Sequence, residues 1–170
     1  MIRLKKVREE DRELLWNINQ KYLYEMTRYY PDEMDGAGNY HYGYFERYFT
    51  DPRRIAYLIL CDEALAGFAM ICPYSYFERE TDHVMAEFTI FPAYRRKHAA
   101  LEAARLILSM HPGRWEIKYN EKNLAGKQLW NKVAAPYRPE RIPFGDGETV
   151  LAFVKPRALS ETAAGGSAPG

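Results

Sequence analysis

The sequence predicts a single α+β domain, an α/β sandwich in which helices cover a mixed β-sheet. Apolar residues alternate along several short stretches, as in half-buried strands, and recur every three or four residues along others, as in amphipathic helices. In chain order these stretches read strand, helix, helix, three strands, helix, strand, helix and two strands. This order predicts six or seven strands and about four helices, and it excludes the regular strand–helix alternation of a doubly wound sheet.

Length and composition are those of one globular domain. The chain has 170 residues, 47% of them hydrophobic, and a formal net charge of +1. This balance gives no electrostatic reason to expect a nucleic-acid partner or a membrane surface. No apolar run approaches the length of a membrane span, and residues 1–6 lack a signal-peptide pattern. We therefore expect a cytoplasmic protein, either a monomer or a homodimer.

Residues 1–156 are expected to form the domain and residues 157–170 a disordered tail. The tail is rich in alanine, glycine and serine, which cannot bury enough apolar surface to become ordered. The two cysteines, Cys61 and Cys72, lie on apolar strand patterns. They are expected to be reduced, buried thiols, and no metal site is predicted.

The first half of the chain is expected to hold three strands and two helices. Acidic residues 9–11 follow the first strand and favour the positive end of a helix dipole. Aromatic residues at helical spacing before residue 50 predict a second, short helix, and two later apolar runs predict a hairpin with residues 62–66 as its turn. The strands are expected over residues 2–7, 55–61 and 67–73, and the inward stripe of the first helix consists of Leu15, Ile18, Tyr22 and Met26.

The second half adds the remaining strands and helices. Pro92 cannot continue a central ladder, so the strand before it ends there. An alanine-rich stripe marks the next helix, which stops at Pro112 and Gly113. Three prolines then predict an extended segment before the last strand. These elements are expected over residues 84–91, 99–110, 115–119, 123–133 and 149–154.

Residues 85–101 combine a strand, a basic loop and the start of a helix. A helix start presents free backbone N–H groups and a positive dipole end, which suit an anion. Three adjacent cations, Arg95, Arg96 and Lys97, suit a multiply charged anion such as a pyrophosphate. Simple alternation along the strand separates one face, with Ala86, Phe88 and Ile90, from the other, with Met85, Glu87, Thr89 and Phe91.

The basic loop resembles motif A of the GNAT N-acetyltransferases, whose fingerprint is Gln/Arg-x-x-Gly-x-Gly/Ala. Arg95 and Ala100 match its two ends, whereas His98 stands where the family has its central Gly. Glycine there lets a phosphate approach the backbone without interference from a Cβ. We expect His98 to keep a helical conformation and to donate its own N–H. The alternative is a surface histidine without a contact.

Residues 123–130 are similar to motif B of the same family, Asn-x-x-Ala-x-x-x-Tyr. Asn123, Gly126 and Trp130 stand at its three marked positions. Both motifs occur in the family's order and spacing. The resemblance implies the GNAT fold, a mixed and mostly antiparallel sheet that splays between its fourth and fifth strands.

The resemblance also implies acetyl-CoA as the cofactor. Its pantetheine arm would bond the backbone of the fourth strand, and its pyrophosphate would sit at the basic loop and helix start. The predicted cofactor-binding residues are Phe88, Thr89, Ile90, Arg95, Arg96, Lys97, His98, Ala99, Ala100, Asn123 and Trp130.

Glu87 is the predicted catalytic residue. An amine must lose a proton before it attacks the thioester, and a carboxylate on this strand can accept that proton. Alternatively, Glu87 pairs a neighbouring cation or holds the substrate, and Glu116 is the second candidate for the base. Trp130 stands where the family has a Tyr that can protonate the leaving thiolate. An indole N–H cannot supply this proton. Trp130 is therefore either a packing residue or the site of a step in which another group supplies the proton.

The acceptor is expected to contact a segment rich in tyrosines and carboxylates. Aromatic side chains with polar tips, together with carboxylates, favour a hydroxylated, cationic molecule, although the same residues could form a satellite core beside a solvated loop. The predicted substrate-binding residues are Tyr22, Asp35, Tyr40, Tyr42, Tyr74 and Glu87.

These observations lead to one principal hypothesis and two alternatives. The principal hypothesis is an acetyl-CoA-dependent N-acetyltransferase that modifies a primary amine of a small cationic molecule. The pattern also looks like that of aminoglycoside 2'-N-acetyltransferases, such as those directed at kasugamycin, which would imply antibiotic resistance. The alternatives are a peptide or protein N-acetyltransferase and a catalytically silent CoA-binding module.

Overall fold

The computed structural model describes residues 1–95 and 98–159. Arg96 and Lys97, two of the expected phosphate ligands, lie outside the described residues, as does most of the predicted tail (160–170). Within the described residues, no helix combines the length and the apolarity needed to cross a lipid bilayer.

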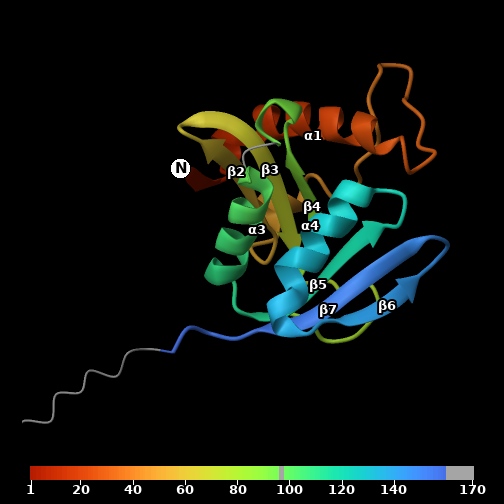
Figure 1. Cartoon of the computed structure of the whole chain (residues 1–170). Helices are drawn as coiled ribbons and strands as arrows, with labels where there is room; N and C mark the ends of the chain where they lie inside the picture. The colour runs from red at the N-terminus through yellow and green to blue at the C-terminus, as the bar shows by residue number, and fades with distance from the viewer. Residues whose placement is uncertain (96–97, 160–170) are drawn as a thin grey trace, which may run out of the picture.

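One seven-stranded sheet organises the chain, with the strand order β1-β2-β3-β4-β5-β7-β6 (Figure 1). All neighbouring strands pair antiparallel except β4 and β5, which are parallel. This arrangement confirms the predicted fold class. The strands are β1 Ile2–Lys6, β2 Ile55–Cys61, β3 Ala64–Cys72, β4 His83–Ile90, β5 Gly113–Asn120, β6 Glu140–Phe144 and β7 Glu148–Lys155.

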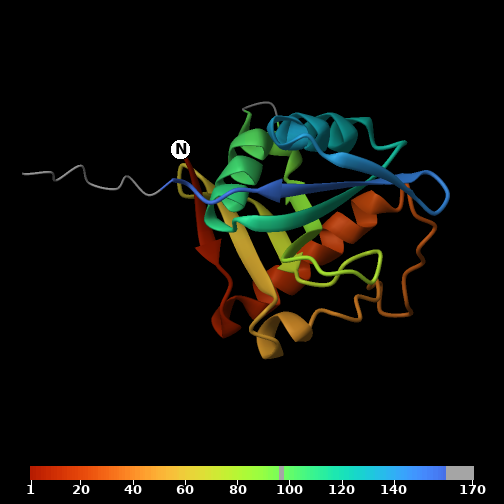
Figure 2. The ribbon, with the colours of Figure 1, turned by 90° about the horizontal axis from the view of Figure 1, so that it is seen from below.

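The α-helices lie on both faces of the sheet (Figure 2). Helices α3 (Ala99–Met110) and α4 (Leu124–Ala134) cover one face, where they share a core with Ile71, Ile117 and Leu151. Helices α1 (Arg12–Met26) and α2 (Arg47–Thr50) cover the other, where their apolar side chains pack on Leu58, Phe68 and Met70. The two separate cores give the predicted sandwich.

The β2–β3 hairpin is tighter than the sequence suggests. Strand β3 begins at Ala64, so only Asp62 and Glu63 form the turn instead of residues 62–66. Both turn residues have a positive φ, 47° and 67°, as the two-residue turns that follow the strand twist require. Neither residue is glycine, which is why the turn chemistry is not visible in the sequence.

A β-bulge in β4 changes the pattern of faces that simple alternation predicts. Met70 pairs with Glu87, but the next residue of β3, Ile71, pairs with Met85, so Ala86 is the extra residue. Met85 consequently belongs to the core beneath α3 and α4, together with Ile90. Glu87 lies on the opposite face, so the prediction that Met85 and Glu87 share a face was wrong. A bulge re-aims side chains in this way, often beside a functional site.

Strands β4 and β5 separate just after this bulge. Their parallel pairing covers only His83–Met85 of β4 and Trp115–Ile117 of β5. Strand β4 continues to Ile90 and pairs there only with β3, while β5 continues to Asn120 beside β7. In the described part of the chain, the β5-facing edge of residues 86–90 therefore has no strand partner.

Candidate active site

A cavity of about 1310 Å³ opens where β4 and β5 separate. Its wall includes residues 84–90 of β4 and residues 118–120 of β5. Helix α1, the segment before β2, the connection between β3 and β4, the start of α3 and helix α4 also contribute to the wall. The bulge and the divergence of the strands thus place a large hollow beside unpaired backbone.

Glu87 is the acidic side chain of β4 in this cavity. Burial raises the pKa of its carboxyl from 4.5 to about 7, although hydrogen bonding from the Tyr22 and Tyr42 hydroxyls and the charge of Lys118 act in the opposite direction. A carboxyl with this pKa is partly ionised at neutral pH, so it can both accept and release a proton there.

Tyrosines surround Glu87 and stay protonated. Tyr22 reaches the site from α1 because its ring packs edge-to-face on Phe68 of β3, with the centroids 5.6 Å apart. Burial, followed by the charge of Glu87, raises the pKa values of Tyr22, Tyr42 and Tyr76 above their ordinary range. Their hydroxyls therefore keep their protons, and those of Tyr22 and Tyr42 stabilise the ionised form of Glu87 by hydrogen bonding.

The backbone at the predicted cofactor strand is open. Phe88, Thr89 and Ile90 line the cavity along the β4 edge that faces away from β3. Trp130 of α4 packs on Phe88 with the ring centroids 4.9 Å apart and an angle of 71° between the planes. Trp130 is buried and also lines the cavity, so it forms an apolar wall next to the unpaired edge.

His98 has an unexpected conformation. It precedes α3 as the N-cap, with φ 54° and ψ 11°, in the left-handed region rather than the helical conformation that we expected. Glycine adopts this region without a steric cost, which gives a physical reason for the Gly in motif A. The His98 side chain is exposed, and it makes no capping hydrogen bond within the residues that the structure describes.

The start of α3 borders the cavity through its backbone and small side chains. Ala100 lines the cavity, while Ala99 is buried beneath it. The first-turn N–H groups of a helix have no intrahelical acceptor. This helix start and the open β4 edge fit a long ligand that carries amide groups and phosphates.

Arg95 is engaged in contacts within the protein. Its Nε donates to the Ile90 backbone oxygen at 2.7 Å, and its Nη2 donates to Glu25 Oε2 at 2.7 Å. The guanidinium thereby joins the end of β4 to the last turns of α1. Its side chain is 41% exposed, and it lines the cavity, so a phosphate contact would add to these bonds or replace them.

Asn123 combines two roles. Its Oδ1 accepts a hydrogen bond from Gly126 N at 3.0 Å and caps α4. A Cβ at Gly126 would lie 2.9 Å from Asn123 Nδ2, so an alanine at this position would require the Asn123 side chain to shift. Asn123 lines the cavity, and its amide group remains a possible ligand donor.

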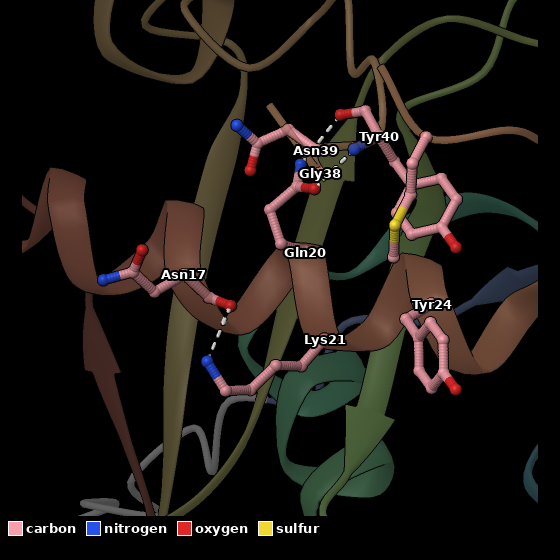
Figure 3. Close-up of a pocket in the computed structure, with 8 residues that line it drawn as sticks. Asn17, Gln20, Lys21, Tyr24, Gly38, Asn39 and Tyr40 are labelled. Carbon is pink, nitrogen blue, oxygen red and sulfur yellow. Dashed lines mark hydrogen bonds between the residues drawn. The ribbon is translucent and has the colours of Figure 1, made fainter. Parts of the chain in front are cut away.

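Asp35 and Tyr40 do not line this cavity, in contrast to the prediction. Asp35 Oδ1 accepts from the backbone N–H groups of Ala37 and Asn39, so this carboxylate stabilises its own loop. Tyr40 is held against α1, because Gln20 Nε2 donates to Tyr40 O at 2.8 Å and Gln20 Oε1 accepts from Tyr40 N at 2.6 Å (Figure 3). The two residues of this contact, Gln20 and Tyr40, line a separate hollow of about 360 Å³.

Of the other predicted substrate residues, Tyr22, Tyr42 and Tyr74 line the large cavity together with Glu87. Glu116, the second candidate base, is 2% exposed and does not line it. Its carboxylate accepts from Ser75 Oγ, Tyr76 N and Arg79 Nε. Glu116 thus anchors the segment between β3 and β4 instead of facing a substrate.

Sequence reasoning missed two cations of the cavity wall, Arg54 and Lys118. Arg54 lies just beyond residues 22–51, the segment whose carboxylates suggested a cationic acceptor. Lys118 lies on β5 with its Nζ 3.1 Å from Glu148 Oε2. Arg54 would have been found if the count of charges in this segment had continued to residue 54. Nothing in the sequence pattern singles out Lys118.

No protein-family model matches this sequence, and no curated protein matches it either. Solved structures do match the fold. An acetyltransferase of the GNAT family from Bacillus cereus superposes with a TM-score of 0.60 at 15% identity, over 93% of this chain and 99% of that one. This protein has the GNAT fold.

Two further GNAT-fold structures contain ligands. An aminoglycoside acetyltransferase, AAC(6')-Ib, in complex with coenzyme A and kanamycin matches with a TM-score of 0.66 at 10% identity, over 91% of this chain and 95% of that one. The PaiA N-acetyltransferase from Thermoplasma acidophilum, in complex with coenzyme A, matches with a TM-score of 0.56 at 12% identity, over 91% of this chain and 99% of that one. At these identities the likeness concerns the fold.

Proposed function

We propose that this protein is an acetyl-CoA-dependent N-acetyltransferase that modifies a primary amine of a small molecule. The observation that carries the proposal is Glu87, a carboxyl with a pKa of about 7 that faces a large cavity beside an unpaired strand edge. The GNAT fold and the coenzyme A complexes of two structural neighbours support it.

The residues present fit acetyl-CoA. The open edge of Phe88, Thr89 and Ile90 would hold the pantetheine arm, with Asn123 beside it, and the start of α3 would hold the pyrophosphate. When bound, acetyl-CoA supplies a thioester whose carbonyl carbon forms a bond to the amine nitrogen as the carbon–sulfur bond breaks.

Glu87 is the group that accepts the amine's proton. Tyr22 and Tyr42 orient its carboxylate by hydrogen bonding, and the surrounding protein keeps its pKa near neutrality. Phe88 and Trp130 form an apolar wall of the site. The thiolate can leave without a protein acid, because a thiol with a pKa of about 8.5 is a fair leaving group. It then takes its proton from solvent.

The test is free-thiol release from acetyl-CoA with a panel of amines. In Glu87→Gln, kcat/KM should fall about 100-fold or more, the usual contribution of a general base, while CoA binding persists. Glu13→Gln serves as the matched control, because Glu13 is exposed on α1 and outside the cavity. Unchanged turnover in Glu87→Gln, or no turnover of any amine by the wild type, would contradict the proposal.

Aminoglycosides are the narrower acceptor candidate, in line with the kanamycin complex of AAC(6')-Ib. Tyr22, Tyr42 and Tyr74 supply the aromatic and hydroxyl groups that a sugar ring needs. An aminoglycoside panel that includes kasugamycin, assayed by thiol release and product mass, tests this candidate. If other amines are acetylated and no aminoglycoside is, the resistance function fails and the transferase remains.

A further inference from the structure

The acceptor side of the cavity contains a buried cation. Arg54 immediately precedes β2 and lines the cavity together with Tyr44, Tyr48 and Tyr74. Its guanidinium carbon is 5.0 Å, 5.4 Å and 4.7 Å from the centroids of these three rings. The side chain is 9% exposed, so the aromatic rings replace most of its contact with water.

Arg54 keeps unused hydrogen-bonding capacity. Its Nε is 3.9 Å from Asp51 Oδ2, too far for a hydrogen bond. This Nε has no hydrogen-bond partner among the described residues, and neither does the buried hydroxyl of Tyr48. Two buried polar groups on one cavity wall are therefore unsatisfied.

Asp51 cannot fully compensate Arg54, because other donors already occupy its carboxylate. It accepts from Arg53 N, Nε and Nη2 at 3.0 Å, 3.1 Å and 3.3 Å, and from the Tyr74 hydroxyl at 2.7 Å. These contacts hold the pKa of Asp51 well below its usual range. A buried cation with such a weak partner is costly unless another anion completes the site.

The cavity as a whole is not acidic. Its described lining has five arginines or lysines and four carboxylates. Two of these carboxylates, Glu25 and Asp51, already form ion pairs with arginines. The expectation of a purely cationic acceptor therefore does not follow from the cavity's charges. The basic residues are Arg28, Arg47, Arg54, Arg95 and Lys118, and the acidic ones are Glu25, Asp32, Asp51 and Glu87.

We propose that the acceptor carries a carboxylate in addition to its reacting amine, and that the Arg54 guanidinium binds this carboxylate. A planar guanidinium matches a carboxylate with two parallel hydrogen bonds. The proposal rests on the proposed function and names the substrate class as amino carboxylates, which excludes aminoglycosides without a carboxylate. Glu87 faces the amine and Arg54 the carboxylate.

The experiment compares ω-amino carboxylates of increasing chain length with their carboxamides, using thiol release from acetyl-CoA. Wild-type protein should prefer the carboxylate in at least one pair by about 10-fold to 100-fold in kcat/KM, the range for hydrogen bonds to a charged group. Arg54→Met should abolish this preference. Arg54→Lys, which keeps the charge without the planar fork, should retain part of it.

Arg105→Met is the matched control, because Arg105 is an exposed arginine of α3 outside the cavity, and it should keep the full preference. The preference is a ratio measured on one protein sample, so a partly unfolded variant lowers both rates equally and leaves the ratio intact. Equal use of the two members by the wild type, or a preference that survives in Arg54→Met, would overturn the proposal.

Calorimetry with the same pairs in the presence of CoA separates this proposal from the proposed function. Tighter binding of the carboxylate, lost in Arg54→Met, supports the carboxylate site even if no thiol is released, and the transferase function then fails alone. If amines are acetylated with no preference for the carboxylate in rate or in binding, the carboxylate site is rejected and the transferase function stands. If neither member of a pair binds and no thiol is released, both proposals are rejected.

Discussion

At the scale of single residues, Glu87 and His98 show how the site departs from ordinary local preferences. Glu87 is a carboxyl in a protein-lined cavity, where desolvation outweighs three groups that favour its ionised form. His98 holds a left-handed backbone conformation that favours glycine. Such departures concentrate at functional sites, where the surrounding structure maintains them.

The raised pKa of Glu87 predicts a pH-dependent cost to stability. The unfolded carboxyl loses its proton near pH 4.5 and the folded one near pH 7. Between these values the folded state binds more protons, so the free energy of unfolding should fall as pH rises, by on the order of 1–2 kcal/mol once solvent in the cavity is considered.

Urea denaturation of the wild type and Glu87→Gln at several pH values checks this prediction. The two proteins should have similar stabilities below pH 4.5, and the advantage of Glu87→Gln should grow up to pH 7 and then level off. Other titrating groups cancel in the difference. A difference that does not change with pH would mean that Glu87 titrates alike in both states.

His98 predicts opposite effects of two substitutions. His98→Gly should stabilise the protein by roughly 0.5 kcal/mol, because relief of the left-handed conformation slightly exceeds the entropy gained by the unfolded chain. His98→Val should destabilise it by about 1 kcal/mol or more, since a β-branched residue tolerates this region poorly. Chemical denaturation measures both, and equal stabilities for the two variants would exclude strain at this position.

At the scale of elements, most of the fold was predictable and the geometry at the site was not. Hydrophobic periodicity predicted β4 and α3, because burial on a sheet or helix leaves a regular pattern. The bulge at Ala86 leaves no such mark, yet it places Met85 on the face opposite Glu87. Arg54 depends on a tertiary contact with a cage of aromatic rings, whereas the Asp35 carboxylate is held within its own loop.

The contact between β3 and β4 makes Gly67 a sensitive position. A Cβ there would lie 2.1 Å from the backbone oxygen of Thr89, so Gly67→Ala must shift the end of β4 at the open edge. We expect a loss of about 2 kcal/mol in the free energy of unfolding, as for overpacking elsewhere, together with weaker CoA binding.

Gly36→Ala is the matched control, because a Cβ at Gly36 would contact nothing within 4 Å. Thermal unfolding and CoA titration of both variants give the comparison. Gly67→Ala with the stability and CoA affinity of Gly36→Ala would show that the β3–β4 spacing does not control the site.

At the scale of the whole molecule, the site lies at the opening between two strands and is enclosed by segments distant in sequence. Arg95 connects the end of β4 to α1 through Ile90 and Glu25. Gln20 fastens the segment around Tyr40 to α1 (Figure 3). Only the first of these contacts lies at the large cavity, where Arg95 and Glu25 belong to the wall.

The central claim is that the opening between β4 and β5 holds acetyl-CoA next to Glu87. Amide hydrogen exchange with and without CoA tests it most directly, since a ligand bonded to an open strand edge protects the amides that it covers. We predict slower exchange in residues 86–90 and at the start of α3, in the wild type and in Glu87→Gln alike. CoA binding that leaves these two segments unprotected, or protects only other parts of the chain, would contradict it.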